Sequence, residues 1–555
     1  MGIKKSLVLP GLILIIVVAA FLRFYNLSNN PNGFYVDEVI TAVNAWSILQ
    51  TGKDEYGKDL PLAFRFFGSY TPPLYTYLTS IPMYVFGYSI FATRFLSAFS
   101  GTVFIVIFFL ILKKINFFND NKVVLLATLL LSITPWAIFY SRVGYETNLA
   151  FVLFSGGCLF LWLSRKKPWF LLPAFGLMSL SSLTYHSEKL LAPLFISTFL
   201  MVFRKAILKK HNFKPLILAF AVYFLISIPQ LLIIFTPANT SRSLGLFYDS
   251  EILSQAKLMN LPLVVSWPIS FSAEFLSQYF SYYSPRNLFF QPDSDLQRSF
   301  PELSVFYPWM VILYLIGLVI LVNQREKSNA RFILLLFLLA PIPAAFTGDP
   351  FSTQRSLPLL LPTMLILSVG LQKITSLHKI SYILVAFLVF LSLASLYRSM
   401  AVLLPNERAT IWGYGFEQLA KEISKNPNEK FIIDGSRIKP AYAELAFYLK
   451  TPPQEIQKSV DPSIKDNYYF MTRWESFYQI ANFETKIIDW KADVYQEQIL
   501  VGDDLAISDT QAKEHFLTKL FEIKDPIGQV VFKGYRTNPR LKCQNSLSKY
   551  CKKMQ

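Results

Sequence analysis

The stretch GFYVDEVITAVNAWSIL, residues 33–49, places two adjacent carboxylates in a mostly apolar segment, directly after an apolar run of membrane length. Apolar residues recur through it at helical spacing, which predicts a helix lying along the membrane interface. Asp37 falls near the N-terminus of this helix, with Thr41 and Asn44 on the same face. The segment is too short to span a bilayer. We therefore expect an ordered helix that holds Asp37 and Glu38 at the membrane edge.

The composition is that of a multi-pass membrane protein. Of the 555 residues, 53% are hydrophobic and 16% are charged, whereas a soluble protein carries about 25% charged residues. About eleven apolar runs are long enough to cross a hydrocarbon layer about 30 Å thick. The first has the basic start of a signal peptide, but no small-residue cleavage site follows, so it is interpreted as an uncleaved span. The predicted spans are 6–25, 95–112, 122–140, 148–164, 168–185, 189–203, 215–235, 304–322, 331–347, 355–371 and 379–397.

Positive charge falls at alternate junctions between these spans. The net charge of +17 would suggest a nucleic-acid partner in a soluble protein, but here the positive-inside rule explains it and no nucleic acid is expected. This pattern predicts a plasma-membrane protein with a cytoplasmic N-terminus and an outer C-terminus. The basic clusters are Lys4 and Lys5; Lys113, Lys114 and Lys122; Arg165, Lys166 and Lys167; Arg204, Lys205, Lys209, Lys210 and Lys214; Arg325, Lys327 and Arg331; Lys373 and Lys379.

Two domains are predicted: a transmembrane domain over residues 1–404 and an extracytoplasmic α/β domain over 405–555. Long outer loops are expected at 26–94 and 236–303. In the second domain, EQLAKEISK (417–425) and AYAELAFYLK (441–450) favour helices. Strands are expected at FIIDGS (431–436), NYYFMTRW (467–474), TKIIDW (485–490) and QVVFKGYR (529–536). Cys543 and Cys551 could pair if the tail is extracytoplasmic, whereas Cys158 is expected to be a buried small residue.

Two acidic sites are candidates for catalysis. Asp37, with Glu38 beside it, could act as general base for a hydroxyl acceptor, although an acid in a first helical turn also caps the helix. The second site is SRVGYETN, residues 141–148, which presents Arg142 and Glu146 at positions i and i+4. An ion pair on the helix surface is the alternative explanation.

Cations from later outer loops are candidates for binding a phosphate. His186 and Lys189 lie in TYHSEKLLAP (184–193), a very short outer turn that suits a lipid-linked phosphate, although Lys189 could simply snorkel. Arg355 in TGDPFSTQRSLPLLLP (347–362) suits bidentate phosphate contact, or else pairs structurally with Asp349. Arg94, which opens the second span, is a further cation of this kind.

A metal site has little support in the sequence. The loop FFQPDSDLQRSF, residues 289–300, contains the tripeptide Asp293-Ser294-Asp295, which resembles the Asp-x-Asp metal motif of nucleotide-sugar enzymes but is common by chance. Zinc-type Cys/His spacing and a Walker loop are not visible. We therefore expect no metal to be required, with Asp293 and Asp295 as the candidates if one binds.

Three segments resemble the first outer loop of GT-C glycosyltransferases, and specifically glycosyltransferase family 39. They are FYVDEVITAVNAWSIL, TPPLYTYLTSIPMYVFG and ATRFLSAFSG; YSRVGYETN and QRSLPLLLP resemble later motifs of that family, and the likeness covers residues 6–400. It implies an all-α polytopic fold with interfacial helices in the first outer loop. It also implies a donor sugar carried on a polyprenyl phosphate and the presence of membrane lipids around the protein.

The resemblance assigns roles to the candidate residues. Asp37 would be the catalytic acid/base and Glu146 the second acid. Arg355, with His186 and Lys189, would hold the donor phosphate, and Arg94 would organise the first loop. Glu38 as a further acid and Arg142 as a further phosphate-binding cation are candidates from the sequence itself. The family includes protein O-mannosyltransferases and lipid A aminoarabinose transferases.

Some departures from the family narrow the expected activity. Thr71 stands where lipid A transferases carry Lys, and the Trp-Trp-Asp signature of oligosaccharyltransferases is absent, which argues against transfer of a whole oligosaccharide to asparagine. The resemblance implies a transferase for a hexose such as mannose, and a single displacement would invert the anomeric centre. The acceptor is expected to be a hydroxyl of a protein, a glycan or a lipid. A transporter or flippase for lipid-linked glycans is the alternative, but it should show matching halves with broken helices, which are not seen. Neither the sugar, the acceptor nor the oligomeric state follows from the sequence.

Overall fold

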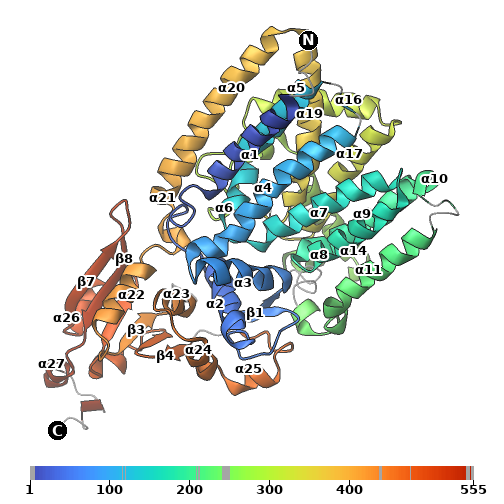
Figure 1. Ribbon diagram of the computed structural model, residues 1–555. Coiled ribbons are helices and arrows are strands. Elements are labelled where there is room, and N and C mark those ends of the chain that lie inside the picture. Colours follow the sequence, from blue (N-terminus) through green and yellow to red (C-terminus); the bar gives the residue numbers. More distant parts are fainter. Residues whose placement is uncertain are drawn as a thin grey trace. The chain divides into compact units, whose positions relative to one another are not determined.

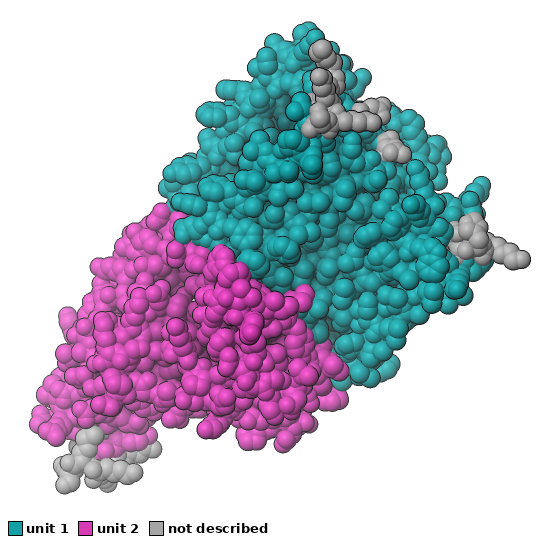
Figure 2. Space-filling view, in the orientation of Figure 1, with its two compact units in different colours: residues 1–27, 71–75, 94–402 teal, residues 28–70, 76–93, 403–555 magenta. Residues whose placement is uncertain are grey.

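The computed structural model divides into two compact units, which are described separately. Unit 1 contains residues 1–27, 71–75 and 94–402, and unit 2 contains 28–70, 76–93 and 403–555 (Figure 2). The compact units therefore cut the chain at more places than the single boundary predicted at residue 404. The residues that the structure describes are 7–115, 117–118, 120–207, 209, 213–240, 250–349, 351–436, 441–474, 477–545 and 550–551.

Unit 1 is a bundle of apolar helices (Figure 1). Among the described residues, six helices are long and apolar enough to cross a membrane, or seven if a bent pair counts as one span. The protein is therefore a multi-pass membrane protein, as predicted. The helices are α1 (Val8–Phe24), α4 (Ile90–Lys114), α5 (Asn121–Ile133), α6 (Pro135–Arg142), α7 (Glu146–Ser164), α8 (Leu171–Ser182), α9 (His186–Val202), α10 (Arg204–Ile207), α11 (Phe213–Leu232), α13 (Ser250–Leu258), α14 (Leu263–Ser281), α15 (Pro285–Phe289), α16 (Met310–Asn323), α17 (Ser328–Leu339), α18 (Ile342–Ala345), α19 (Leu360–Leu377) and α20 (Ile380–Tyr397).

Each predicted span coincides with helical structure, although the count of eleven stays a prediction. The six long spans are Ile90–Lys114, Glu146–Ser164, Phe213–Leu232, Ser328–Ala345, Leu357–Leu377 and Ile380–Glu407. The last of these includes a π-helical segment, Arg398–Leu403. Helices α1 and α16 are apolar but shorter. Of the basic residues used to orient the chain, Lys4, Lys5 and Lys210 lie outside the described residues.

The predicted span at 122–140 is broken. Helices α5 and α6 meet at an angle of 50°, and Pro135 opens α6 while Thr134 before it is extended. Proline cannot donate the backbone hydrogen bond that would continue α5, and it disfavours helical geometry in the residue before it. The break sets α6, which carries Tyr140 and Arg142, at an angle of 50° to α5.

Two glycines let α16 and α19 approach closely. A Cβ atom on Gly317 would lie 2.0 Å from the carbonyl oxygen of Ile366, and one on Gly370 would lie 2.0 Å from that of Leu313. Small residues are what allow helix backbones to touch where lipid supplies no hydrophobic drive for association. This contact fixes α19, which follows directly after the loop that carries Arg355.

The segment at 236–303, predicted as an outer loop, is more helical than its sequence indicates. It contains α13, α14 and α15, where only a long loop was expected. Helix α14 includes Pro268 and alternates polar with aromatic residues, so it lacks the apolar run by which the spans were recognised.

Unit 2 combines most of residues 28–93, predicted as the first outer loop, with the C-terminal part of the chain. The predicted helix at residues 33–49 is α2 (Val36–Thr51), and the apolar helix expected after Pro72 and Pro73 is α3 (Leu74–Phe86). Between them lies a small hairpin, β1 (Phe64–Phe66) and β2 (Ser69–Thr71), which the sequence did not predict. Buried residues of α2 belong to the same hydrophobic core as those of the C-terminal strands.

The C-terminal part is an α/β structure around one six-stranded sheet, as predicted. The strand order is β4-β5-β3-β6-β8-β7; β3 is parallel to β5 and β6, and the other pairs are antiparallel. The strands are β3 (Phe431–Asp434), β4 (Tyr478–Ile480), β5 (Phe483–Lys486), β6 (Ile499–Gly502), β7 (Thr518–Lys524) and β8 (Val530–Arg536), and the helices are α21 (Leu404–Glu407), α22 (Phe416–Lys425), α23 (Ala441–Tyr448), α24 (Pro453–Ser459), α25 (Pro462–Asp466), α26 (Asp509–Glu514) and α27 (Pro539–Gln544).

Two strand predictions differ from the structure: TKIIDW is a strand only at Thr485 and Lys486, where β5 ends, and the second is wrong throughout. NYYFMTRW, residues 467–474, forms turns and irregular backbone rather than a strand. The hydroxyl of Tyr468 donates to the buried carboxylate of Asp54 at 2.5 Å, and Arg65 donates to the carbonyl oxygens of Met471 and Arg473. The polar groups of this segment therefore bind the first outer loop, and its β-type composition is overridden by those contacts.

A cluster of buried polar side chains holds the segment that follows α2 in place within unit 2. Asp54 also accepts backbone hydrogen bonds from Tyr56 and Lys58. Burial raises the pKa of Asp54 to about 6, against the opposing effect of the hydrogen bond from Tyr468. The neighbouring carboxylate, Glu55, accepts from Asn44 at 3.1 Å and from Tyr442 at 2.9 Å. These bonds tie α2 to α23, although the two helices are far apart in the sequence.

One pair of cysteines is bonded and the third cysteine is buried, as their positions in the sequence suggested. Cys543 and Cys551 form a disulfide bond. Cys158 is a free, buried residue inside α7.

Candidate functional site

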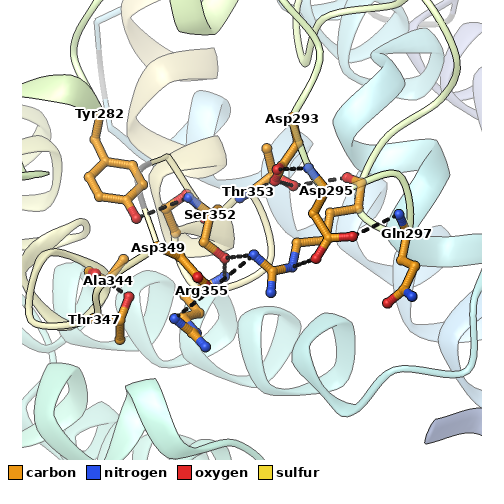
Figure 3. A network of polar contacts seen from close by, with 12 residues as sticks. Tyr282, Asp293, Asp295, Gln297, Ala344, Thr347, Asp349, Ser352, Thr353 and Arg355 are labelled. Carbon is orange, nitrogen blue, oxygen red and sulfur yellow. Dashed lines mark hydrogen bonds and ion pairs between the residues drawn. The ribbon is translucent and has the colours of Figure 1, made fainter. Parts of the chain in front are cut away.

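Two loops of unit 1 meet in a network of polar side chains (Figure 3). One loop follows α15 and carries Asp293, and the other lies between α18 and α19 and carries Thr353. Asp293 is buried and accepts hydrogen bonds from the backbone N–H of Thr353 at 2.9 Å and from its hydroxyl at 2.8 Å. Burial raises the pKa of Asp293, and these hydrogen bonds partly oppose the rise. The buried carboxylate therefore holds the two loops together.

Two arginines share one carboxylate in this network. Asp349 accepts from Arg355 Nη1 at 2.9 Å and from Arg298 Nη1 at 3.1 Å, and Arg298 Nε also contacts Asp295 at 3.1 Å. The alternative prediction of a pair between Arg355 and Asp349 is thus confirmed. Burial lowers the pKa of Arg298, but Asp295 and the other nearby groups outweigh it and raise the pKa above its ordinary value. The side chain of Arg355 is 31% exposed, so it is only partly enclosed by the protein.

Tyrosines connect this network to the starts of α7 and α9. The hydroxyl of Tyr140 lies 2.8 Å from that of Thr353, and its ring lies 6.4 Å from the ring of Tyr145. Tyr145 directly precedes α7, and Tyr185, which interacts electrostatically with Tyr140, directly precedes α9. The predicted residues Glu146 and His186 are therefore the first residues of two helices whose ends lie beside the network.

A second carboxyl group lies near Glu146. Glu188 is 1% exposed, its Oε2 atom has no hydrogen-bond partner among the described residues, and its charge interacts with that of Glu146. Lys189 donates from Nζ to Asn239 at 2.8 Å, so it is held by protein and does not simply reach for solvent. The sequence placed Glu188 in this turn but gave no reason to select it over its neighbours.

Arg142 and Arg94 are buried and donate to backbone carbonyl oxygens. Arg142 contacts those of Leu22, Arg23 and Asn26, and Arg94 contacts that of Leu27 at 3.0 Å. Arg142 and Glu146 were predicted to share one face of a helix, which is wrong, because α6 ends at Arg142 and α7 begins at Glu146. These contacts hold the end of α1, and the phosphate-binding role of both arginines stays a prediction.

In unit 2, the two adjacent acids of α2 differ in their surroundings. Glu38 is fully buried and its Oε2 accepts the backbone N–H of Tyr35 at 3.3 Å, so the helix-capping interpretation holds for this residue. Asp37 is exposed in the first turn of α2. A carboxyl group that the sequence did not single out, Glu444 of α23, interacts electrostatically with Asp37. The one signal for it was an acid inside the otherwise apolar segment AYAELAFY.

The metal candidates are engaged by protein donors. Asp293 accepts from Thr353 and from the backbone of Asp295, and Asp295 accepts from Arg298 and Gln297. Within the described ranges, no group of three or more His, Cys, Asp or Glu side chains could hold a metal ion. The expectation that no metal is required therefore stays a prediction that rests on the sequence.

Comparison with known proteins supports the fold. No protein-family model matches the chain, and curated proteins give no significant sequence match. Oligosaccharyltransferase AglB from Archaeoglobus fulgidus, solved in complex with an inhibitory peptide and a dolichol-phosphate, is similar in structure with a TM-score of 0.51 at 13% identity. The similarity covers 96% of this chain and 74% of AglB, and the same enzyme tethered to an acceptor peptide gives 0.50 over the same shares.

A further solved structure is ArnT from Cupriavidus metallidurans bound to undecaprenyl phosphate, with a TM-score of 0.43, 13% identity, and coverage of 94% of this chain and 97% of ArnT. The two AglB comparisons carry the conclusion, because their TM-scores are 0.50 and 0.51 and their similarity extends over 96% of this chain. The chain has the GT-C fold that its sequence predicts.

Proposed function

We propose that this protein is a membrane glycosyltransferase that moves a sugar from a polyprenyl-phosphate donor to an acceptor hydroxyl on the outer side of the membrane. The observation that carries the proposal is the network in which Asp349 holds Arg298 and Arg355 at the start of α19. The fold adds support, because AglB with this fold was solved with a dolichol-phosphate.

Arg355 is suited to hold the phosphate of the donor. A guanidinium group carries five N–H donors, and the contact with Asp349 uses Nη1, so other donors of the half-buried side chain can reach a phosphate oxygen. The carboxylate of Asp349 fixes the direction of the group before the donor arrives. Cations that are already in position stabilise the negative charge of a leaving phosphate without reorganisation.

Asp37 is suited to take the proton of the acceptor. It is an exposed carboxylate in the first turn of α2, whose backbone is held by the capping contact of Glu38. A general base must be able to reach the acceptor hydroxyl, which an exposed position allows. Direct attack of the acceptor oxygen on the anomeric carbon would invert its configuration. Glu146 and Glu188 supply further acidic groups in unit 1.

The finer assignments follow the family resemblance. We propose a hexose such as mannose as the transferred sugar, a protein, glycan or lipid hydroxyl as acceptor, and chemistry that requires no metal. His186 and Lys189 are proposed to support Arg355 at the phosphate, because both begin α9, whose N-terminus carries partial positive charge.

The test uses the purified full-length protein in nanodiscs with radiolabelled polyprenyl-phosphate hexoses. Arg355→Ala should lower kcat/KM by about 10²-fold, the size expected when one donor to a developing anion is removed. Arg331→Ala is the matched control, because Arg331 forms an exposed ion pair with Glu326 and should leave kcat/KM unchanged. Asp37→Asn should abolish transfer. Unaltered transfer by both site variants would refute the proposal, and donor translocation without transfer would favour a flippase.

A further inference from the structure

A cavity of about 130 Å³ lies in unit 1, between α13, α14 and the end of α18 with the loop after it. Two carboxyl groups line it, Glu251 of α13 and Glu274 of α14. They line it together with three aromatic rings, those of Phe271, Phe275 and Phe346. A concave site that combines aromatic walls with a few polar groups is the usual form of a small-molecule site. The cavity therefore has the composition of a binding site.

The three phenylalanine rings form one packed wall. The ring centroid of Phe346 lies 4.8 Å from that of Phe275 and 6.1 Å from that of Phe271. All three side chains are only partly buried, so part of each ring faces the cavity. Along α14 the wall continues as a row of rings at every fourth residue, with neighbouring centroids 5.0–6.5 Å apart: Trp267, Phe271, Phe275 and Tyr279. Because each ring packs against the next, the wall is in place before a ligand arrives.

Glu274 is held in position by a buried amide. Its Oε1 atom accepts a hydrogen bond from Nε2 of Gln278 at 2.8 Å. Gln278 is 8% exposed, so this donor is supported by the interior of the protein. A carboxylate accepts hydrogen bonds at both of its oxygens, and the contact with Gln278 uses one of them. The other oxygen of Glu274 can therefore accept a hydrogen bond from a ligand in the cavity.

The size of the cavity fits one sugar ring. A single water molecule needs about 10–15 Å³ of such space. The cavity, at about 130 Å³, therefore has room for about ten atoms of that size. A hexose has about a dozen carbon and oxygen atoms, whereas a disaccharide would need about twice the volume.

The cavity adjoins the loop that carries the proposed phosphate-binding residue. Thr347 and Gly348 line it, and the next residue, Asp349, holds Arg355 at 2.9 Å. Helix α14 is tied to the same loop, because the hydroxyl of Tyr282, which directly follows α14, accepts a backbone N–H of that loop at 3.1 Å (Figure 3). Consecutive Cα atoms are about 3.8 Å apart, so the cavity wall and Asp349 are direct neighbours. A donor with its phosphate at Arg355 can therefore place its sugar in the cavity.

We propose that this cavity binds the sugar of the donor: Glu251 and Glu274 accept hydrogen bonds from its hydroxyl groups, and the phenylalanine rings cover its apolar C–H face. This inference rests on the proposed function and adds to it the residues that select the sugar. The cavity suits a neutral sugar, because hydroxyl groups donate well to carboxylates. It disfavours a uronic acid, whose own carboxylate would be repelled by Glu251 and Glu274.

The test is equilibrium binding of two radiolabelled lipids to the full-length protein in nanodiscs, with no acceptor present. One lipid is a polyprenyl-phosphate hexose, and the other is the same polyprenyl phosphate without a sugar. Glu274→Gln replaces a charged acceptor by a neutral one, so it should weaken binding of the first lipid about tenfold and leave binding of the second unchanged. Arg355→Ala should weaken binding of both lipids, because it acts on the phosphate.

Glu326→Gln is the matched control. Glu326 forms an exposed ion pair with Arg331, so this variant should bind both lipids like the wild type. The wild type should bind a polyprenyl-phosphate hexuronic acid at least about tenfold more weakly than the hexose, and Glu274→Gln should narrow that difference. Equal binding of the two sugars by the wild type would overturn the selection by charge.

Unchanged binding of both lipids by Glu274→Gln would overturn the sugar site. An equal loss for both lipids would also overturn it, because a sugar site cannot affect a lipid that has no sugar. The two hypotheses fail differently. Sugar-dependent binding by a protein that transfers no sugar would refute the proposed function, whereas an active transferase whose donor binding is unaltered in Glu274→Gln would refute the sugar site alone.

Discussion

Replacing Thr353 with valine should loosen the network that positions Arg298 and Arg355. The hydroxyl of Thr353 contacts three oxygen atoms: Asp293 Oδ2 at 2.8 Å, the Tyr140 hydroxyl at 2.8 Å and the Arg298 carbonyl at 2.9 Å. A hydroxyl has one proton to donate and can also accept, so it makes two good hydrogen bonds at a time. Valine has nearly the same shape but makes neither.

The size of the effect follows from the partners. A hydrogen bond to a charged group contributes about 1.5–3 kcal/mol and one between neutral groups about 0.5–1.5 kcal/mol. Asp293 keeps the backbone N–H of Thr353, at 2.9 Å, in the variant. We therefore expect Thr353→Val to lower the free energy of unfolding by about 2–4 kcal/mol, most of it from the contact with Asp293.

The assay is thermal unfolding of the detergent-solubilised protein, together with the KM for the donor. Thr353→Ser is the matched control, because it keeps the hydroxyl and should remain within about 1 kcal/mol of the wild type. The donor KM should rise in Thr353→Val and not in Thr353→Ser, since Arg298 and Arg355 depend on the loop that Asp293 anchors. Equal melting temperatures for the two variants would refute the assigned role of the hydroxyl.

Three other outcomes are expected. Asp349→Ala should raise the donor KM about fivefold, since half-exposed ion pairs contribute about 1 kcal/mol or less; an unchanged KM would show that Arg355 is positioned without it. The pKa of Asp54 is raised to about 6, so the folded state binds more protons than the unfolded state between about pH 4 and 6. Stability should fall by about 3 kcal/mol as pH rises through that window, and melting curves of Asp54→Asn should lack the fall. Gly370→Ala would place a Cβ atom 2.0 Å from a backbone oxygen of α16 and should cost about 1–3 kcal/mol, measured by thermal unfolding against Gly176→Ala, whose Cβ would make only ordinary contacts.

Local patterns in the sequence were sufficient to locate the membrane helices and α2. These patterns are apolar runs of membrane length and the helical spacing of apolar residues in 33–49. They depend only on residues close together in the sequence, so they can be recognised without knowledge of the tertiary structure. The same reasoning put Asp37 in a first helical turn and recognised β3, α22 and α23. It failed at residues 467–474, where β-type composition was overridden by the contact of Tyr468 with Asp54.

The partners of the charged groups were decided only by the tertiary structure. From the sequence, Arg355 could either bind a phosphate or form an ion pair with Asp349. In the folded protein Asp349 contacts both Arg355 and Arg298. Glu274 was one acid in an aromatic segment until α14 packed against α13 and α18 and made it part of a cavity wall. Helical periodicity tells which side of an element a residue occupies, whereas pairing across hundreds of residues depends on how the elements pack. The sequence by itself therefore determined where the helices and candidate acids lie, and the packing of helices and loops determined which charges meet.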